Sequence, residues 1–315
     1  MIVRAPLRVG IVGAGRTRQG LGPYFARWFE AAGARVAAVS GRTLDGARRT
    51  ADELAAAFGH PVDAAADAAA LARTVDLLVV ASPVATHLEG LDAALAAGVP
   101  CLCEKPLVAA EHEAAGRARI AAFGRRGLLL AENCQWPHAL PALFELHPEL
   151  TGAPVWRVAM GLGPIGAGAA MVADSLSHVL SVVQALAPLD DAVVHDVRAT
   201  DRSATAVRNV VSFTVGARAG PVAVELHLEH CPQPPRPAWI AVNGRRVDRR
   251  IGAGYTISFV RGDGRALNVT DPLQRLVYGL VSTLESEPRE RTEAFASLDV
   301  RLRLYTTILR ALETD

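Results

Sequence analysis

A lysine between a glutamate and a proline stands where an apolar run of the sequence ends. Residues 99–106, VPCLCEKP, are apolar up to Cys103 and then change to Glu-Lys-Pro. Proline has a fixed φ angle and restricts the residue before it, so the amine of Lys105 is held at the end of its strand. An amine that is removed from water near another positive charge has a lowered pKa and is suited to proton exchange. We therefore interpret Lys105 as a catalytic candidate.

A second candidate for proton chemistry lies in the sequence DSLSH. Asp174 and His178 are four residues apart, so on a helix they share a face and their side chains can meet. Histidine titrates near neutral pH and acts as a general base, and a neighbouring carboxylate can hold it in one tautomer. The alternative is an ordinary polar pair at a helix cap or an interface, and the two residues alone leave both interpretations open.

Glycines follow the first apolar strand-like run, VGIVGAG. Two of them allow a tight turn in which backbone N–H groups face the pyrophosphate of a dinucleotide at the start of a helix. The third glycine of this motif would fall at Arg18, and the next glycines are Gly20 and Gly22, so we expect a lengthened turn. Its arginines either contact phosphate or are solvated loop residues. The cofactor-binding residues expected in this turn are Gly13, Gly15, Arg16, Thr17, Arg18 and Gly20.

The end of the second strand-like run, VSGRT, bears on the choice of cofactor. An acid about 20 residues after the glycine turn would bind the free 2′-hydroxyl of NAD, whereas arginine without an acid suits the 2′-phosphate of NADP. No carboxylate lies between Glu30 and Asp45, and the ribose position holds Ser40, Arg42 and Thr43. We therefore expect NADP(H) to be favoured over NAD(H). NAD stays open as the alternative, because Asp45 can swing towards the ribose.

Two further strand-like runs end in polar residues, in ASPVATH and CLCEKP. Ligands bind beyond the carboxyl ends of the strands in an open parallel sheet, so these residues are expected at the cofactor crevice. For the histidine of ASPVATH, the alternative is a first-turn helical residue exposed to water. The cofactor-binding residues expected here are Ser82, Pro83, His87, Glu104 and Lys105.

The first 132 residues alternate between strand and helix patterns. The run VDLLVVASP has no polar face, which is typical of parallel strands buried on both sides. Residues 1–132 are therefore expected to form an α/β dinucleotide-binding domain, a Rossmann fold with a doubly wound parallel sheet. Strands are expected within 7–15, 34–42, 75–83, 99–106 and 127–133, and helices within 21–33, 44–59, 87–98 and 110–124.

Residues 133–315 are expected to form a C-terminal α+β domain for substrate binding and oligomerisation, with a large, mostly antiparallel open sheet. In VAVELHLE, Glu225, His227 and Glu229 share one face and apolar residues share the other. Through the polar face we expect a homodimer or homotetramer. The terminal helices can pack back on the first domain. Strands are expected within 208–216, 220–230, 238–244 and 255–262, and helices within 138–150, 169–186, 271–286 and 294–313.

The composition argues against several classes of partner. The chain has 315 residues, a net charge of +1 and no clustered basic stripe, so no nucleic acid partner is expected. No uncharged apolar run reaches the ~18 to 20 residues of a membrane span, and no signal-peptide pattern opens the chain, so no membrane partner is expected. Four scattered cysteines suit free thiols in a reducing cytoplasm, where we expect the protein. No metal site is expected, because His227 and His230 face opposite sides of a strand.

Taken together, VGIVGAG, ASPVATH, AAGVPCLCEKPL, AENCQWP and GAGAAMVADSLSH resemble, in order and approximate spacing, motifs of the glucose-fructose oxidoreductase, inositol dehydrogenase and rhizopine catabolism (Gfo/Idh/MocA) family. The resemblance covers nearly the whole chain. It implies a Rossmann domain followed by an α/β domain whose open sheet often forms an oligomer interface, with hydride transfer at a sugar-like hydroxyl. It also implies that Lys105 contacts the nicotinamide ribose and the substrate, while Asp174 and His178 handle substrate hydroxyls and the proton.

The sequence departs from that family near the expected substrate. The family's frequent His-x-x-Asp is His178 followed by Ser181, and its Asn-Arg-Arg-aromatic stretch reads Asn-Cys-Gln-Trp at 133–136. The loss of two arginines and an acid indicates a less polar or neutral substrate rather than an acidic one. The substrate-binding residues expected are Asn133, Gln135, Trp136, Asp174 and His178.

The sequence therefore predicts an NAD(P)-dependent dehydrogenase or reductase acting on CH–OH groups, which transfers a hydride between a nicotinamide cofactor and a sugar- or polyol-like small molecule. Two alternatives stay open: a glycosidase that uses tightly held NAD in an internal redox cycle, and a catalytically silent nucleotide-binding or sensor protein of the same fold. The presence of Lys105, Asp174 and His178 favours the enzyme.

Overall fold

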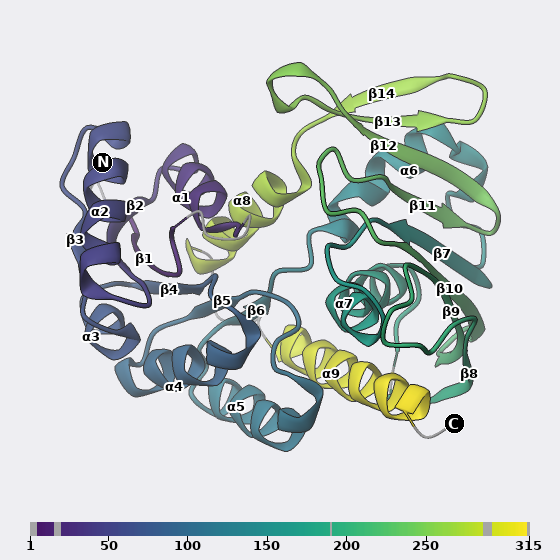
Figure 1. Cartoon of the computed structure of the whole chain (residues 1–315), viewed down its shortest axis with the longest axis horizontal. Coiled ribbons are helices and arrows are strands. Elements are labelled where there is room, and N and C mark those ends of the chain that lie inside the picture. Colours follow the sequence, from purple (N-terminus) through teal and green to yellow (C-terminus); the bar gives the residue numbers. More distant parts are fainter. Residues whose placement is uncertain (1–4, 16–19, 190, 286–291, 314–315) are drawn as a thin grey trace. The chain divides into compact units, whose positions relative to one another are not determined.

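The computed structural model describes residues 5–15, 20–189, 191–285 and 292–313. Figure 1 shows the helices and strands along the chain. Contacts within the chain divide it into two compact units. The first unit is Met1–Asn133 with Leu273–Asp299, and the second is Cys134–Pro272 with Val300–Asp315.

The first unit is built on a six-stranded sheet in which all neighbouring strands are parallel. The strand order β3-β2-β1-β4-β5-β6 is that of a doubly wound Rossmann sheet. Strands β4 and β5 are buried along their whole length, which explains their lack of a polar face. The prediction of a parallel Rossmann sheet is confirmed. Its strands are β1 Arg8–Val12, β2 Arg35–Ser40, β3 Asp63–Ala64, β4 Leu77–Val80, β5 Cys101–Cys103 and β6 Leu130–Glu132.

The helices between these strands begin and end at residues that the sequence marks. Thr43 caps the start of α2 by accepting a hydrogen bond from the backbone of Gly46 at 3.1 Å, and Gly59, with φ 73°, ends the helix. Strand β3 and helix α3 were not expected, because two and five residues are too short for a periodic signal. The helices are α1 Gly22–Ala31, α2 Leu44–Phe58, α3 Ala68–Ala72, α4 His87–Ala97 and α5 Glu113–Arg125.

The core of the first unit includes a helix from far along the chain. Helix α8, Pro272–Glu285, shares an apolar cluster with Phe25 and Phe29 of α1. The hydroxyl of Tyr278 donates to the carbonyl oxygen of Ala31 at 3.0 Å. Helix α9, Thr292–Glu313, follows it in the chain. The α8 residues in the cluster are Leu273, Val277, Leu280 and Val281, whose spacing puts them on one face of the helix.

The second unit is built on an eight-stranded sheet with the order β14-β13-β12-β11-β7-β10-β9-β8. Among the described strands of this sheet, only the β7–β10 pair is parallel, and the other neighbours are antiparallel. The prediction of a large, mostly antiparallel sheet is confirmed. Its strands are β7 Arg157–Leu162, β8 Val194–Ala199, β9 Arg208–Ala217, β10 Gly220–Glu229, β11 Ala238–Val242, β12 Arg245–Ile251, β13 Ile257–Arg261 and β14 Ala266–Val269.

One face of this sheet is apolar and the other is polar. Along β10, Glu225 and His227 are partly exposed, whereas the alternate residues are buried. Helix α7, Ala169–Leu186, packs on β7 and β10. By length and composition alone α7 is apolar enough to cross a membrane, but 56% of it is buried inside the structure. This burial is what a central helix of a globular core also shows.

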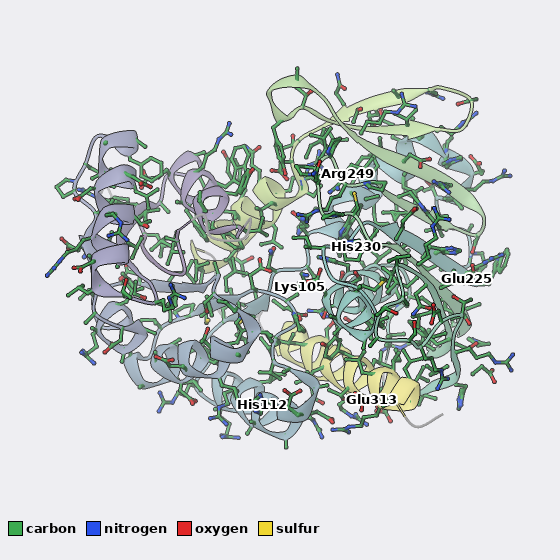
Figure 2. The ribbon with its side chains drawn as sticks, viewed as in Figure 1. Lys105, His112, Glu225, His230, Arg249 and Glu313 are labelled. Atoms are coloured by element: carbon green, nitrogen blue, oxygen red, sulfur yellow. The ribbon has the colours of Figure 1, made fainter. Side chains whose placement is uncertain are left out.

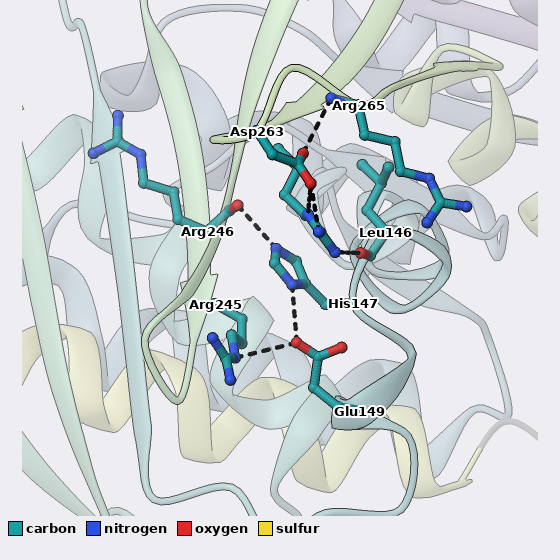
Figure 3. A network of polar contacts seen from close by, with 8 residues as sticks. Leu146, His147, Glu149, Arg245, Arg246, Asp263 and Arg265 are labelled. Atoms are coloured by element: carbon teal, nitrogen blue, oxygen red, sulfur yellow. Dashed lines mark hydrogen bonds and ion pairs between the residues drawn. The ribbon is translucent and has the colours of Figure 1, made fainter.

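A polar network ties helix α6, Leu140–Leu146, to strands β12 and β13 (Figure 3). After the helix, His147 contacts the carbonyl oxygen of Arg246 through Nε2 at 3.1 Å and the carboxylate of Glu149 through Nδ1 at 3.2 Å. Arg261 donates from Nη1 to the carbonyl oxygen at the last residue of α6, at 3.1 Å. These contacts hold β12, the strand that carries Arg249, in place.

Candidate functional site

The carboxyl ends of β1, β2 and β4 lie together in the first unit. The backbone N–H of Gly13 donates to the carbonyl oxygen of Ser40, at 2.9 Å. Gly13 has φ +82°, and a Cβ atom there would lie 2.9 Å from the backbone nitrogen of Ser82. Glycine is therefore the residue that suits this turn. The structure brings together three residues that were predicted to bind the cofactor.

The helix after the turn approaches it through Gly22, which the sequence analysis named after the turn but did not count among the cofactor-binding residues. A Cβ atom on Gly22 would lie 2.5 Å from the carbonyl oxygen of Gly13 and 2.6 Å from Cα of Ala14. Gly22 thus has the packing role of the third glycine in a dinucleotide-binding turn. Gly15 and Gly20 are half-buried. Three other residues predicted for this turn lie outside the described residues: Arg16, Thr17 and Arg18.

The end of β2 presents the residues that were expected at the ribose. Ser40 is 3% exposed, and its hydroxyl has no hydrogen-bond partner among the described residues. Arg42 is exposed, while the hydroxyl of Thr43 caps helix α2. The carboxylate of Asp45 lies 3.2 Å from Nη1 of Arg48, in an exposed ion pair.

Hydrogen bonds on both sides fasten the loop that carries Lys105. Before it, the carboxylate of Glu104 accepts a hydrogen bond from Nδ2 of Asn133. After it, Oε1 of Glu132 accepts one from the backbone N–H of Leu107 at 2.8 Å. Both supporting residues come from the end of β6, the neighbouring strand, so the loop position depends on the parallel pairing of β5 with β6.

Lys105 has a distinctive place in both structure and composition. It is half-buried, and its peptide bond to Pro106 is cis. It is also the only lysine in the sequence, in which lysine and arginine together number 33. Asn133, which was predicted to bind substrate, is 1% exposed and contacts Glu104, a supporting contact that the sequence interpretation did not include.

The ring of His87 joins two loops at the carboxyl edge of the sheet. Its Nε2 lies 2.9 Å from the carbonyl oxygen of Ser82, and its Nδ1 lies 3.0 Å from that of Pro106. His87 is 1% exposed, so the water-exposed alternative is wrong. Burial lowers the pKa of His87, against the bonds to these carbonyls, which raise it. Nearby, Oγ of Ser82 and the carbonyl oxygen of Pro83 accept from the hydroxyl of Thr86 at 2.8 and 2.9 Å.

In the second unit, α7 carries Asp174 and His178 four residues apart, on one face of the helix. Asp174 is exposed and His178 is half-buried. The ring centre of Trp136 lies 6.4 Å from that of His178, in an edge-on arrangement. Trp136 is buried, and Gln135 before it is half-buried. The structure therefore places part of the predicted substrate stretch beside the predicted proton-transfer histidine.

The second unit also contains arginines that no motif indicated. Cζ of Arg249 lies 5.2 Å from the centre of the Trp136 ring, and Nη2 of Arg249 donates to the carbonyl oxygen of Arg236 at 3.2 Å. Figure 2 labels Arg249, on β12, and Lys105, which follows β5 in the first unit. In β12, Arg249 lies two residues after Val247 and two before Ile251, so the three residues share one face of the strand. The two apolar neighbours indicate that this is the apolar face of the sheet. No short-range pattern links it to Trp136.

The described residues contain no group of three or more histidine, cysteine, aspartate or glutamate side chains that could hold a metal ion. On the polar face of the second sheet, His227 contacts Glu225 through Nε2 at 3.1 Å, and its ring centre lies 5.1 Å from that of Trp239 in a tilted arrangement.

The Rossmann half matches a known family. Residues 7–132 match the family model GFO_IDH_MocA, described as an oxidoreductase family with an NAD-binding Rossmann fold. This range includes all six strands of the parallel sheet and the loop of Lys105. The parallel sheet of the first unit and this match identify residues 7–132 as a Rossmann fold that is similar to an oxidoreductase family described as NAD-binding. This match and the curated relatives support the Gfo/Idh/MocA family, and the resemblance expected from the motifs is confirmed.

Curated relatives match part of the chain. Inositol 2-dehydrogenase of Streptomyces avermitilis is 43% identical over 99 residues, which are 30% of this chain and 27% of the relative. Inositol 2-dehydrogenase of Paracoccus denitrificans is 32% identical over 197 residues, which are 59% of this chain and 55% of the relative. The chain thus spans about half, or less, of the length of these relatives.

Solved structures share the fold of both units. UDP-N-acetylglucosamine 3-dehydrogenase GnnA from Acidithiobacillus ferrooxidans has a TM-score of 0.69 at 21% identity, over 98% of this chain and 97% of that one. A mutant of the 3-ketoreductase KijD10 from Actinomadura kijaniata, in complex with NADP, has a TM-score of 0.65 at 22% identity, over 98% of both chains. An oxidoreductase from Agrobacterium radiobacter, in complex with NAD+, has a TM-score of 0.62 at 14% identity, over 95% of this chain and 94% of that one. Both cofactors thus occur among structures of this fold.

Proposed function

We propose that the protein is an NAD(P)-dependent oxidoreductase that transfers a hydride between a nicotinamide cofactor and a hydroxyl or carbonyl group of a sugar- or polyol-like substrate. The main observation behind the proposal is the loop of Lys105 at the carboxyl end of β5. Hydrogen bonds on both sides of Lys105 hold this loop in place, and it lies within the residues that match the family. The relatives named inositol 2-dehydrogenase support a polyol-like substrate.

Three features of the first unit fit a dinucleotide. At Gly13 the backbone is left without a side chain, so a pyrophosphate can approach closely. Among the described residues no side chain caps the start of α1, where the N–H of Gly22 suits a phosphate, although Pro23 after it has no N–H. The buried hydroxyl of Ser40 lies at the end of β2, where a ribose would bind. The bound cofactor would supply the hydride acceptor or donor.

The end of β2 supports NADP(H) as the favoured cofactor. Arg42 is exposed there and suits a 2′-phosphate. The carboxylate of Asp45, which in the alternative would bind the 2′-hydroxyl of NAD, is paired with Arg48. The hydroxyl of Thr43 is used by the helix cap. The preference for NADP(H) therefore depends mainly on Arg42.

In this proposal two residues divide the chemistry. Lys105 holds the nicotinamide ribose and the substrate in place with its amine. His178, oriented by Asp174, accepts the hydroxyl proton as the hydride leaves the same carbon, and returns it in the reverse direction. Gln135 and Trp136 contact the substrate near His178.

We also propose a homodimer or homotetramer that forms through the polar face of the second sheet. Nη2 of Arg157 lies 2.7 Å from the carboxylate of Glu225, and Cζ of Arg246 lies 4.2 Å from the centre of the Trp239 ring. Arginine and aromatic side chains of this kind are enriched at protein interfaces.

We further propose a cytoplasmic location. The cysteines of the chain are free, and burial raises the pKa of Cys101, which fits a reducing compartment.

The proposed function is tested by a screen of polyols, aldoses and lactones with both cofactors, followed by nicotinamide absorbance. Two variants accompany the screen: Lys105→Met, and Lys105→Arg, which keeps the charge. We expect wild-type turnover with at least one substrate and loss of turnover in both variants. Substrate cleavage without net cofactor reduction, with NAD that never exchanges, would instead support the glycosidase. Cofactor binding without any turnover would support the silent alternative.

The single lysine makes a direct test of the site possible. Protein labelled with ¹³C at Cε of lysine gives one lysine side-chain resonance, that of Lys105. If Lys105 contacts the cofactor, this resonance shifts when NADP(H) is added. A resonance that does not respond to either cofactor would remove Lys105 from the cofactor site.

A further inference from the structure

Two arginines of the second unit lie next to each other with buried N–H groups. Nη2 of Arg249 donates to the backbone carbonyl oxygen of Arg236 at 3.2 Å. Nε and Nη2 of Arg236, and Nε of Arg249, are buried and have no hydrogen-bond partner in the described part of the chain. A buried donor without an acceptor costs free energy, and a charged donor costs more. The site therefore lacks the acceptor that would satisfy it.

The charges of the two guanidinium groups are also left without a direct counter-ion. Neither arginine forms an ion pair with a described aspartate or glutamate, although the more distant Asp271 and Tyr255 act on Arg249. Burial lowers the pKa of Arg249, and the charge of Arg236 acts in the same direction. Two like charges that are partly removed from water repel each other, and an anion bound between them would offset both costs.

The segment that carries Arg236 is held in place by hydrogen bonds to the loop after β7. The backbone N–H of Cys231 donates to the carbonyl oxygen of Pro164 at 2.8 Å, and Nδ1 of His230 lies 3.2 Å from the carbonyl oxygen of Gly166. Figure 2 labels His230 and Arg249, which come from this segment and from β12. Arg249 is therefore placed by β12, and Arg236 by the connection between β10 and β11, whose first residues these hydrogen bonds hold.

The pair lies on the side of the sheet that carries the predicted substrate residues. Arg249 stacks over Trp136, whose ring lies beside His178 of α7. Arg250, the next residue of β12, alternates to the opposite face and is exposed. An anion held by Arg249 would thus lie on the same side of the sheet as the residue proposed to move the substrate proton.

We propose that Arg236 and Arg249 bind an anionic group of the substrate, so that the substrate is a sugar acid or a sugar phosphate. Arginine presents its N–H donors in a planar fork that matches carboxylate and phosphate oxygens. The inference rests on the proposed function. It reverses the expectation of a neutral substrate, because arginines absent from residues 134–135 are supplied from the distant segment before β11 and from β12.

The anion site is tested first without a sugar. Inorganic phosphate and acetate are added to the wild type, Arg236→Gln, Arg249→Gln and Arg250→Gln at fixed ionic strength, with chloride as the reference salt, and thermal unfolding is measured. Phosphate, acetate or both should raise the melting temperature of the wild type and of Arg250→Gln but not of the other two variants. Equal responses in all four proteins, or none, would overturn the proposal. Arg249→Lys, which keeps the charge and loses the fork, should respond weakly.

Sugars then identify the anionic group. Glucuronate, glucose 6-phosphate and glucose are titrated by calorimetry into protein saturated with cofactor. One anionic sugar should bind about tenfold to a hundredfold more tightly than glucose, and Arg249→Gln should abolish the difference. A preference for glucuronate identifies a carboxylate, and a preference for glucose 6-phosphate identifies a phosphate ester. Binding of glucose as tight as that of both anionic sugars would refute the inference.

The two proposals fail in different ways. If anionic sugars bind through the arginines but no substrate of any charge is oxidised or reduced, the anion site stands and the proposed oxidoreductase does not. If neutral polyols are oxidised while phosphate and anionic sugars affect all variants alike, the oxidoreductase stands and the anion site does not.

Discussion

Replacement of His87 by asparagine or by glutamine tests whether this buried ring positions Lys105. The ring joins the loop after β4 to the loop after β5, with Nε2 at 2.9 Å from the carbonyl oxygen of Ser82 and Nδ1 at 3.0 Å from that of Pro106. An asparagine amide reaches about as far as Nδ1, and a glutamine amide about as far as Nε2. Each variant therefore keeps one connection and breaks the other.

The expected loss of stability follows from the burial of the site. The neutral ring has one N–H and donates to one of the two carbonyl oxygens, so the loss of that donor costs about 1 to 3 kcal/mol, and the ring atoms removed leave a small void that adds about 1 kcal/mol. We expect the variant that loses this donor to lose about 2 to 4 kcal/mol in free energy of unfolding, and the other variant about 1 kcal/mol. His87→Gln also releases Pro106, beside Lys105, so its turnover should fall about tenfold or more. His87→Asn keeps that connection and should fall much less.

The free energy of unfolding should also depend on pH through His87, and the direction of this dependence can be predicted. Burial, the largest effect, lowers the folded-state pKa of His87 below its ordinary value of 6.5, while the carbonyl contacts and the charge of Glu132 oppose this. The unfolded state therefore binds a proton first as the pH falls. The stability contributed by neutral His87 is present above pH 6.5 and is lost below it, at up to about 1.4 kcal/mol per pH unit, until the pH falls below the folded pKa. Neither variant should show this part of the slope.

Three measurements decide the question. Denaturant unfolding at several pH values gives the free energies, steady-state kinetics gives turnover, and the ¹³C resonance of the single lysine reports the environment of its amine. We expect His87→Gln to move this resonance more than His87→Asn does. Equal turnover and equal resonances in two variants of equal stability would show that His87 is a packing residue without a positioning role.

Four further results are expected. Arg42→Ala should reduce the preference for NADP(H) over NAD(H) by about tenfold to a hundredfold in calorimetric titrations, and tighter binding of NAD(H) to the wild type would contradict the preference. His178→Ala should lower turnover about a hundredfold or more with little change in cofactor affinity, whereas turnover near that of the wild type would remove His178 from the mechanism. Gly22→Ala should cost about 1 to 3 kcal/mol of stability, because its Cβ would lie 2.5 Å from a carbonyl oxygen. Its control is Gly279→Ala in α8, where a Cβ meets nothing within 4 Å and the helix should gain up to about 1 kcal/mol; equal effects of the two changes would refute this argument. Light scattering should give two or four times the chain mass of 33.2 kDa, and a mass of one chain at micromolar concentration would end the proposal of an oligomer.

Local patterns in the sequence were sufficient for the fold class and for the loop of Lys105. Apolar runs without a polar face indicate parallel strands, and glycines or polar residues mark where the runs end, because these signals depend only on neighbouring residues. In a parallel sheet the ends of such strands meet at one edge, so Gly13, Ser40 and Ser82 could be grouped before the structure was known. The alternation along β10 likewise determined which of its faces is polar.

Only the tertiary structure decided which side chains from distant segments meet. His87 is buried because the loop after β5 covers it, and no local pattern distinguishes it from an exposed first-turn residue. The approach of Gly22 at the start of α1 to Gly13 after β1 is likewise a tertiary contact. Arg236 and Arg249 converge because β11 and β12 pair beside β7 in the eight-stranded sheet. Sequence periodicity specifies the face of an element, but partners far apart in the chain are set by the register and order of strands, which are non-local.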